Sequence, residues 1–218
     1  MFTKNQNVQK KHINGNNYVS LMLKMSNYFS LNYLKSLGVK IYGNHIQISK
    51  LARIYNPSKL ILHDNIRIDD FTILSGRGHI EIGNYVHIGS QCSISSYSNI
   101  QFHNYSGISS GVRLFGSTDD YSGKFMTNPT VPSPFLGTIH GDIILHKHVV
   151  IGSGSIILPN TILAEGTAVG SLSMINKNTE AWKIYAGNPA KIIKNREKNC
   201  LEYEKRIEIT TTTMNDVN

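Results

Sequence analysis

The chain has 218 residues, of which 40% are hydrophobic and 17% charged, so it can bury a sizeable core and lacks the composition of a disordered protein. Its net charge of +8 suits an acidic partner such as a phosphorylated small molecule, but the Lys and Arg residues are scattered and form no nucleic-acid-binding motif. No apolar run of about 18 residues and no signal peptide is visible, so we expect a cytoplasmic protein with no stable membrane insertion.

The N-terminal segment, residues 1–38, precedes any repeat. Apolar residues occur at helical spacing from Tyr18 to Leu37, and Gly38 follows at the position where helices commonly end. We therefore expect a polar tail and then one or two helices that cap the next element.

A six-residue period begins near Val39. Aliphatic residues recur at every sixth position, and small residues lie four places after most of them. A period of six fits neither a helix nor an ordinary strand, but it is typical of parallel β-helices, in which three six-residue units form one triangular coil. The pattern is clearest at Leu145, Ile151, Ile157, Leu163, Val169 and Ile175.

Earlier coils repeat every 20 residues rather than 18, which predicts one widened corner in each coil. The segments Ser75 to His79 and Ser95 to Asn99 are the expected corners, stacked one above the other. In the third coil the same corner becomes a long loop from Phe115 to Ile143, which has no six-residue period. A loop of this length in a compact domain is usually functional. Cys92 occupies an inward, small-residue position and is expected in the core.

After Ile175 the repeat ends. The sequence predicts a turn at Pro189 and then a charged helix that covers the last coil. The expected organisation is a tail and helical cap over 1–38, a β-helix domain over 39–194 with a loop at 115–143, and a C-terminal helix and tail over 195–218.

The repeat, the loop "LFGSTDDYSGKFMTNP" and above all "IYAGNPAKIIK" resemble the hexapeptide-repeat acyltransferases, especially the galactoside, maltose and capsule or O-antigen sugar O-acetyltransferases. The resemblance runs from about Val39 to Lys198. It implies an all-β fold, a left-handed parallel β-helix, assembled as a homotrimer with an acetyl-CoA site between neighbouring chains. It also implies that five residues bind CoA: Ser153, Ser171, Asn176, Lys177 and Lys194.

Acyl transfer to a hydroxyl needs a base, and here the sequence departs from the family. Related enzymes place a His at the start of the loop, whereas this chain has Asp119, and an ordinary Asp with a pKa near 3.9 is a weak base. The adjacent Asp120 is expected to raise that pKa. His148, on the corner just after the loop rejoins the repeat, is predicted to be the base, oriented by Asp119 with Asp120 in support. His87 is the reserve candidate.

These features predict an acetyl-CoA-dependent sugar O-acetyltransferase of surface polysaccharide biosynthesis that uses no metal. One alternative is an N-acetyltransferase of a nucleotide-linked amino sugar, which needs no enzymic base if the amine arrives neutral. A second is a zinc-dependent carbonic anhydrase built on columns of corner histidines. A third is a non-catalytic β-solenoid scaffold, which would have no reason to interrupt its repeat with a 29-residue loop. The sequence names neither the sugar nor the acylated group.

Overall fold

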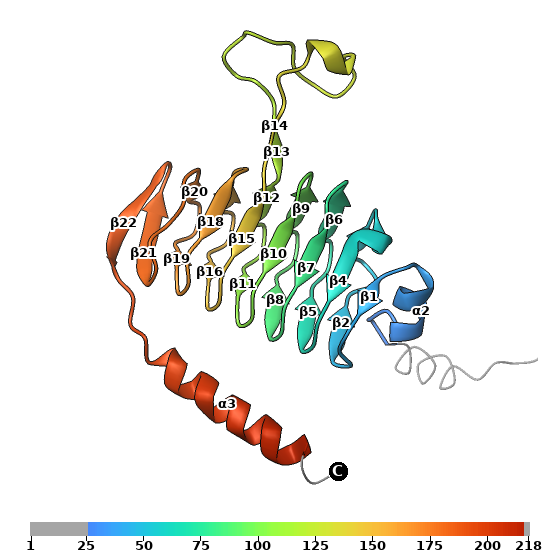
Figure 1. The fold of residues 1–218 in the computed structure, drawn as a ribbon, viewed down its shortest axis with the longest axis vertical. Helices are drawn as coiled ribbons and strands as arrows, with labels where there is room; N and C mark the ends of the chain where they lie inside the picture. Colours follow the sequence, from blue (N-terminus) through green and yellow to red (C-terminus); the bar gives the residue numbers. More distant parts are fainter. Residues whose placement is uncertain (1–25, 216–218) are drawn as a thin grey trace, which may run out of the picture.

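The computed structural model describes residues 26–215, with side chains as far as residue 210. Its first element is helix α2 (Leu31–Ser36), whose N-terminus is capped by the Ser30 hydroxyl oxygen, 3.2 Å from the Tyr33 amide. Leu34 points from this helix into the core and is fully buried. The helix therefore closes one end of the solenoid, as expected (Figure 1). The part of the predicted helical segment before residue 26 lies outside the described residues.

The predicted β-helix is confirmed. Successive strands alternate among three parallel sheets, so each coil adds one strand to each side of a triangular prism (Figure 1). The first sheet contains β1 (Lys40–Ile41), β4 (Leu60–Leu62), β7 (Ile80–Ile82), β10 (Ile100–Phe102), β15 (Ile143–Leu145) and β18 (Thr161–Leu163).

The second sheet is extended by an antiparallel strand at its end. From β2 to β19 its strands carry Ile or Val at the inward position, because a β-branched side chain fills the narrow prism and suits extended backbone, and β21 carries Tyr185 there. The sheet contains β2 (Ile46–Ile48), β5 (Ile66–Ile68), β8 (Val86–Ile88), β11 (Gly107–Ile108), β16 (Val150–Ile151), β19 (Ala168–Val169), β21 (Lys183–Gly187) and β22 (Ala190–Asn195).

The third sheet carries the widened corners. Ile73 of one coil pairs with Ser93 of the next, and Gly76 pairs with Ser96, which confirms that the two 20-residue coils stack in register. The sheet contains β3 (Arg53–Ile54), β6 (Ile73–Gly76), β9 (Ser93–Ser96), β12 (Arg113–Phe115), β17 (Ile156–Ile157) and β20 (Met174–Ile175). A 3-10 turn, Pro57–Lys59, connects its first strand to the first sheet.

The core consists of stacked aliphatic side chains inside the prism. Each buried Leu or Ile is worth about 1.5–3 kcal/mol relative to exposure, so the ladders supply most of the favourable free energy of folding. Cys92 lies among them, 1% exposed, and burial raises the pKa of its thiol to about 11. This confirms its predicted place in the core.

The long loop leaves the prism on a short stalk. β13 (Ser117–Thr118) and β14 (Ile139–His140) pair antiparallel, and the loop between them contains a 3-10 turn, Ser133–Phe135. The loop therefore projects well beyond the coils (Figure 1).

The C-terminal segment differs from the prediction of a turn and a covering helix. Residues 183–195 form the β21–β22 hairpin, with a cis peptide bond before Pro189 at its turn, and this hairpin covers the end of the second sheet. The helix, α3 (Cys200–Asn215), starts only after an extended segment and runs alongside the solenoid (Figure 1). A hairpin forms here because β21 adds to β19 as a regular strand, although the six-residue period has ended.

One corner column, between the first and second sheets, holds bulky residues in the left-handed conformation. Positive φ is uncommon for such residues, so the stack must hold each of them in place. Neighbouring rings stack in parallel, with centroids 4.9 Å apart for Tyr85 and Tyr105. Only glycine fits at position 166, because a Cβ there would lie 2.3 Å from the indole of Trp182. The column with φ between 55° and 60° comprises Asn65, Tyr85, Tyr105, His148 and Trp182.

Candidate active site

An open groove of about 760 Å³ lies between the loop stalk and the outer face of the third sheet. Its walls are mainly apolar on the sheet side, where Ile156 and Met174 project outward from β17 and β20. The loop side supplies hydroxyl and carboxylate groups. The full lining is Phe115, Ser117, Thr118, Asp119, Asp120, Tyr121, Ile139, Ile156, Leu158 and Met174.

The two loop carboxylates differ in their surroundings. Asp120 accepts hydrogen bonds from the hydroxyl and amide of Ser122 and from the amides of Lys124 and Phe125. The bonds from Ser122 and these amides hold the pKa of Asp120 below its usual value. Asp120 is an ionised acceptor that shapes the loop.

Asp119 is less constrained. One carboxylate oxygen, Oδ2, accepts a hydrogen bond of 3.1 Å from the Asn128 amide. Within residues 26–210 no hydrogen bond to the other oxygen, Oδ1, occurs. Asp119 therefore combines a fixed position at the groove with a carboxylate oxygen that can accept a proton or hydrogen bond from a ligand.

Four of the residues expected to bind CoA lie at the corners on either side of the third sheet, and the fifth, Lys194, lies on the second sheet. Ser153 and Ser171 are exposed at the same corner of successive coils, and the Leu172 amide donates to the Ser153 carbonyl, so the predicted stacking is confirmed. Asn176 and Lys177 follow β20 directly and are exposed. Lys194 is exposed on β22, opposite Ile184. The two serines precede the strands that line the groove, and Asn176 and Lys177 follow the last of them.

His148 lies on a different corner from the loop and does not pair with Asp119. Its Nε2 is 2.6 Å from Oε2 of Glu204 in α3, its ring stacks on Tyr105 with centroids 5.3 Å apart, and it is 7% exposed. The predicted orientation of His148 by Asp119 is therefore corrected, because strand β15 separates the two corners and the C-terminal helix supplies the carboxylate. Sequence could not show this, since Glu204 is 56 residues away along the chain.

Glu204 holds this contact as a charged group. Burial opposes its ionisation, but hydrogen bonds from Lys147 and His148 hold the pKa of Glu204 below its usual value. The same bond raises the pKa of Lys147. Arg196 adds a hydrogen bond of 2.7 Å to the His148 carbonyl, so the segment before α3 is fixed as well.

A histidine oriented by a carboxylate does occur on the exposed face of the second sheet. His87 Nε2 lies 2.8 Å from Oδ2 of Asp69, and Arg67 Nε donates to the other oxygen at 2.7 Å. Burial opposes the ionisation of Asp69, but the hydrogen bonds with His87 and Arg67 keep its pKa below the usual value. Arg67 and His87 are 20 residues apart and pair in neighbouring strands, and Asp69 lies two residues after Arg67, so the 20-residue coil predicts that the three are neighbours. The reserve candidate thus has the geometry expected of His148.

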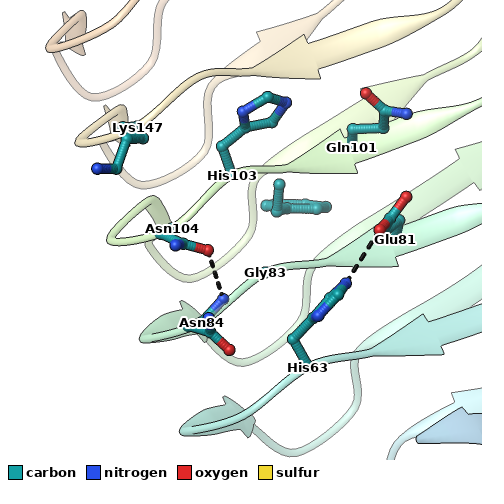
Figure 2. A pocket seen from close by; sticks show the side chains of 9 residues that line it. His63, Glu81, Gly83, Asn84, Gln101, His103, Asn104 and Lys147 are labelled. Carbon is teal, nitrogen blue, oxygen red and sulfur yellow. Dashed lines mark hydrogen bonds and ion pairs between the residues drawn. The ribbon is translucent and has the colours of Figure 1, made fainter. Parts of the chain in front are cut away.

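A second groove, of about 400 Å³, lies on the outer face of the first sheet, and most of the side chains that line it are polar or charged (Figure 2). His63 and Glu81 form an ion pair of 3.0 Å, and the Asn84 amide donates to the Asn104 side chain. Burial, with the neighbouring His146, lowers the pKa of His103. The charged groups that line this groove are paired, since Lys147 is held by Glu204. The loop groove is therefore the better candidate for proton transfer.

Across residues 26–215, no three His, Cys, Asp or Glu side chains are grouped so that they could hold a metal ion. Neither α2 nor α3 is sufficiently long and apolar to cross a membrane.

No family model matches the chain, but individual proteins do. The dTDP-4-amino-4,6-dideoxy-D-glucose acyltransferase of Escherichia coli is 41% identical over 172 residues, which are 78% of this chain and 90% of that protein. A putative lipopolysaccharide biosynthesis O-acetyl transferase, WbbJ, of Escherichia coli K12 is 29% identical over 64% of this chain and 70% of its own.

The crystal structure of AntD, an N-acyltransferase from Bacillus cereus, superimposes with a TM-score of 0.83 at 37% identity, covering 86% of this chain and all of AntD. That structure contains dTDP and 3-hydroxybutyryl-CoA, and a variant of AntD has been crystallised with dTDP-4-amino-4,6-dideoxyglucose and coenzyme A. The expected likeness to galactoside and maltose O-acetyltransferases is therefore corrected: the more similar proteins act on a dTDP-linked amino sugar.

Proposed function

The chain belongs to the hexapeptide-repeat β-helix acyltransferases, and on that premise we propose that it transfers a short acyl group from acyl-CoA to the 4-amino group of a dTDP-linked 4-amino-4,6-dideoxy sugar. This is the N-acylation considered above as an alternative to sugar O-acetylation, with a wider choice of acyl group. The observation that carries the proposal is the groove under the loop, which places the Asp119 carboxylate beside an apolar wall.

The chemistry suits an amine better than a hydroxyl. The amine nitrogen attacks the thioester carbonyl, a C–N bond forms, the C–S bond breaks, and the nitrogen loses a proton while the departing CoA thiolate gains one. No strong base is needed when the amine arrives neutral, which accounts for Asp119 near the start of the loop, where sugar O-acetyltransferases have His. Asp119 would accept a hydrogen bond from the amine and hold its lone pair toward the carbonyl carbon.

The cosubstrate would lie along the third sheet. The backbone groups at Ser153 and Ser171 are available to the pantetheine arm, and Asn176, Lys177 and Lys194 to the rest of CoA, with the two lysines attracting its phosphates. The acyl group would then contact Ile156 and Met174. An apolar wall of this kind accepts acyl groups longer than acetyl.

The loop supports a homotrimer. It stands off its own solenoid (Figure 1). It carries exposed apolar side chains, including Tyr121, Phe125 and Phe135. A neighbouring chain would cover these side chains and complete the acyl-CoA site. We place the enzyme in the cytoplasm, in the synthesis of an N-acylated sugar for a surface polysaccharide.

A direct test uses the purified protein with dTDP-4-amino-4,6-dideoxyglucose and either acetyl-CoA or 3-hydroxybutyryl-CoA, with release of the CoA thiol as the readout. The matched control is the dTDP sugar that carries a hydroxyl at C4. We expect acylation of the amino sugar and little thiol release with the control. Preference for the sugar with the C4 hydroxyl would favour an O-acyltransferase instead. CoA binding without turnover of either sugar would contradict the proposal.

A further inference from the structure

Three flat side chains form a stack at the corner where the loop leaves the solenoid. The rings of Tyr97 and His140 are parallel, with an interplanar angle of 4° and centroids 3.9 Å apart. The Arg77 guanidinium carbon lies 5.3 Å from the Tyr97 centroid. Aromatic pairs and cation–π contacts of this kind hold two groups in one relative orientation.

The three residues occupy the same position in successive coils. Ile80, Ile100 and Ile143 pair in register across β7, β10 and β15, and each member of the stack lies three residues before one of them. His140 thus stands in the solenoid's own corner column although it belongs to β14, the returning strand of the loop stalk. The stack continues the solenoid into the stalk.

The backbone at the base of the stalk has little room to move. The Gly116 amide donates to the Ser95 carbonyl at 2.8 Å, and the Gly141 amide donates to the Gly116 carbonyl at 3.0 Å. A Cβ at Gly116 would lie 2.9 Å from the Tyr97 amide nitrogen, so the outgoing chain passes directly over the Tyr97 backbone. These backbone contacts fix the position of the base of the stalk. The stack of Arg77, Tyr97 and His140 fixes the orientation of the stalk relative to the solenoid.

The lean of the stalk sets the position of the loop carboxylate. Thr118 pairs with Ile139, next to His140, and Asp119 is the residue that follows Thr118. A rotation of the stalk about its base would therefore move Asp119 relative to Ile156 and Met174, which are fixed in the third sheet.

We propose that Tyr97 is a positioning residue for acyl transfer: by stacking between Arg77 and His140 it holds the loop stalk at the angle that places Asp119 over the groove. This inference rests on the proposed function for its kinetic consequence, but the stacking and its effect on the loop do not depend on the identity of the acceptor.

The test compares Tyr97→Ala with Tyr97→Phe, which keeps the ring. Tyr55→Ala is the matched control, because Tyr55 also lies beside an arginine, Arg53, but in an early coil far from the loop. Hydrogen–deuterium exchange of residues 117–140 is measured in the free proteins, together with the acceptor KM, kcat and the acyl-CoA Kd.

For Tyr97→Ala we expect faster exchange across the loop and stalk, an acceptor KM raised roughly two- to tenfold, and an unchanged acyl-CoA Kd. Tyr97→Phe and Tyr55→Ala should match the unsubstituted protein. His140→Ala should reproduce Tyr97→Ala, which keeps the inference testable if one variant folds poorly.

Unchanged loop exchange in Tyr97→Ala overturns the inference whatever the substrate proves to be. Faster exchange with unchanged kinetics overturns the catalytic role of the stack. If the unsubstituted protein does not acylate the amino sugar, the proposed function fails, while the exchange experiment still decides whether Tyr97 orders the loop.

Discussion

Oε2 of Glu204 lies 2.6 Å from Nε2 of His148 and joins helix α3 to the aromatic corner column of the solenoid. Both side chains are less than 10% exposed, so the pair is shielded from water and from any substrate in the loop groove. His148 therefore docks the C-terminal helix in this structure.

Replacing His148 should weaken stability more than catalysis. His148→Ala leaves a buried carboxylate without one of its donors, and we expect a loss of about 1–3 kcal/mol in the free energy of unfolding. Chemical denaturation measures this, with His45→Ala as a control at an exposed corner. Removing a general base would instead lower kcat by about 10²- to 10⁴-fold. A loss of that size with normal stability would therefore identify His148 as the base.

The stabilising contact between α3 and the solenoid should be lost at low pH. Because the pKa of Glu204 is lowered in the folded protein, its contribution is present above its unfolded pKa and is lost as the pH falls through the folded pKa. The difference in unfolding free energy between the unsubstituted protein and Glu204→Gln should therefore shrink as the pH falls below about 4.5. Denaturation at a series of pH values measures it, and a difference that grows toward acid would contradict the contact.

The loop carboxylate should matter to turnover. Asp119→Asn keeps the shape but removes the charge that would orient the amine, and we expect kcat to fall by about two orders of magnitude with the acyl-CoA Kd unchanged. The comparison variant is His87→Asn, which removes the His87–Asp69 pair on the exposed face of the second sheet. If His87→Asn abolishes turnover and Asp119→Asn does not, the reacting group lies on the second sheet.

Asp120 should act on the loop rather than on the reaction. Asp120→Asn weakens bonds to the Lys124 and Phe125 amides, so we expect a higher acceptor KM with kcat nearly unchanged. Steady-state kinetics separate the two constants. A fall in kcat equal to that of Asp119→Asn would mean that the two carboxylates act as one unit.

The exposed lysines at the end of the solenoid should bind the cosubstrate. A charge-assisted hydrogen bond is worth roughly 1.5–3 kcal/mol, so Lys177→Ala and Lys194→Ala should each raise the acyl-CoA KM by about one to two orders of magnitude. The acceptor KM should hardly change. Lys59→Ala, at the other end, is the control; equal losses in all three variants would indicate a general effect of charge.

The features predicted well from sequence are those that repeat. The ladder from Leu145 to Ile175, the stacked corners and the departure of the loop follow from local spacing, because every coil imposes the same inward positions. Two features were missed because they depend on contacts outside the repeat. The hairpin after Trp182 has no six-residue period, and the partner of His148 comes from a charged helix whose docking face carries no periodic signal.

The β21–β22 hairpin also determines how the solenoid meets its surroundings. An open parallel coil presents unpaired amides and carbonyls, which invite a second molecule to add strands end to end. Here β22 runs antiparallel to β21, turns at Pro189 and carries Lys191 and Lys194 along the outermost edge. Another coil arriving at that edge meets the wrong strand direction and a row of positive charge. The residues that end the repeat on the second sheet thus also disfavour the addition of a further parallel strand to that sheet.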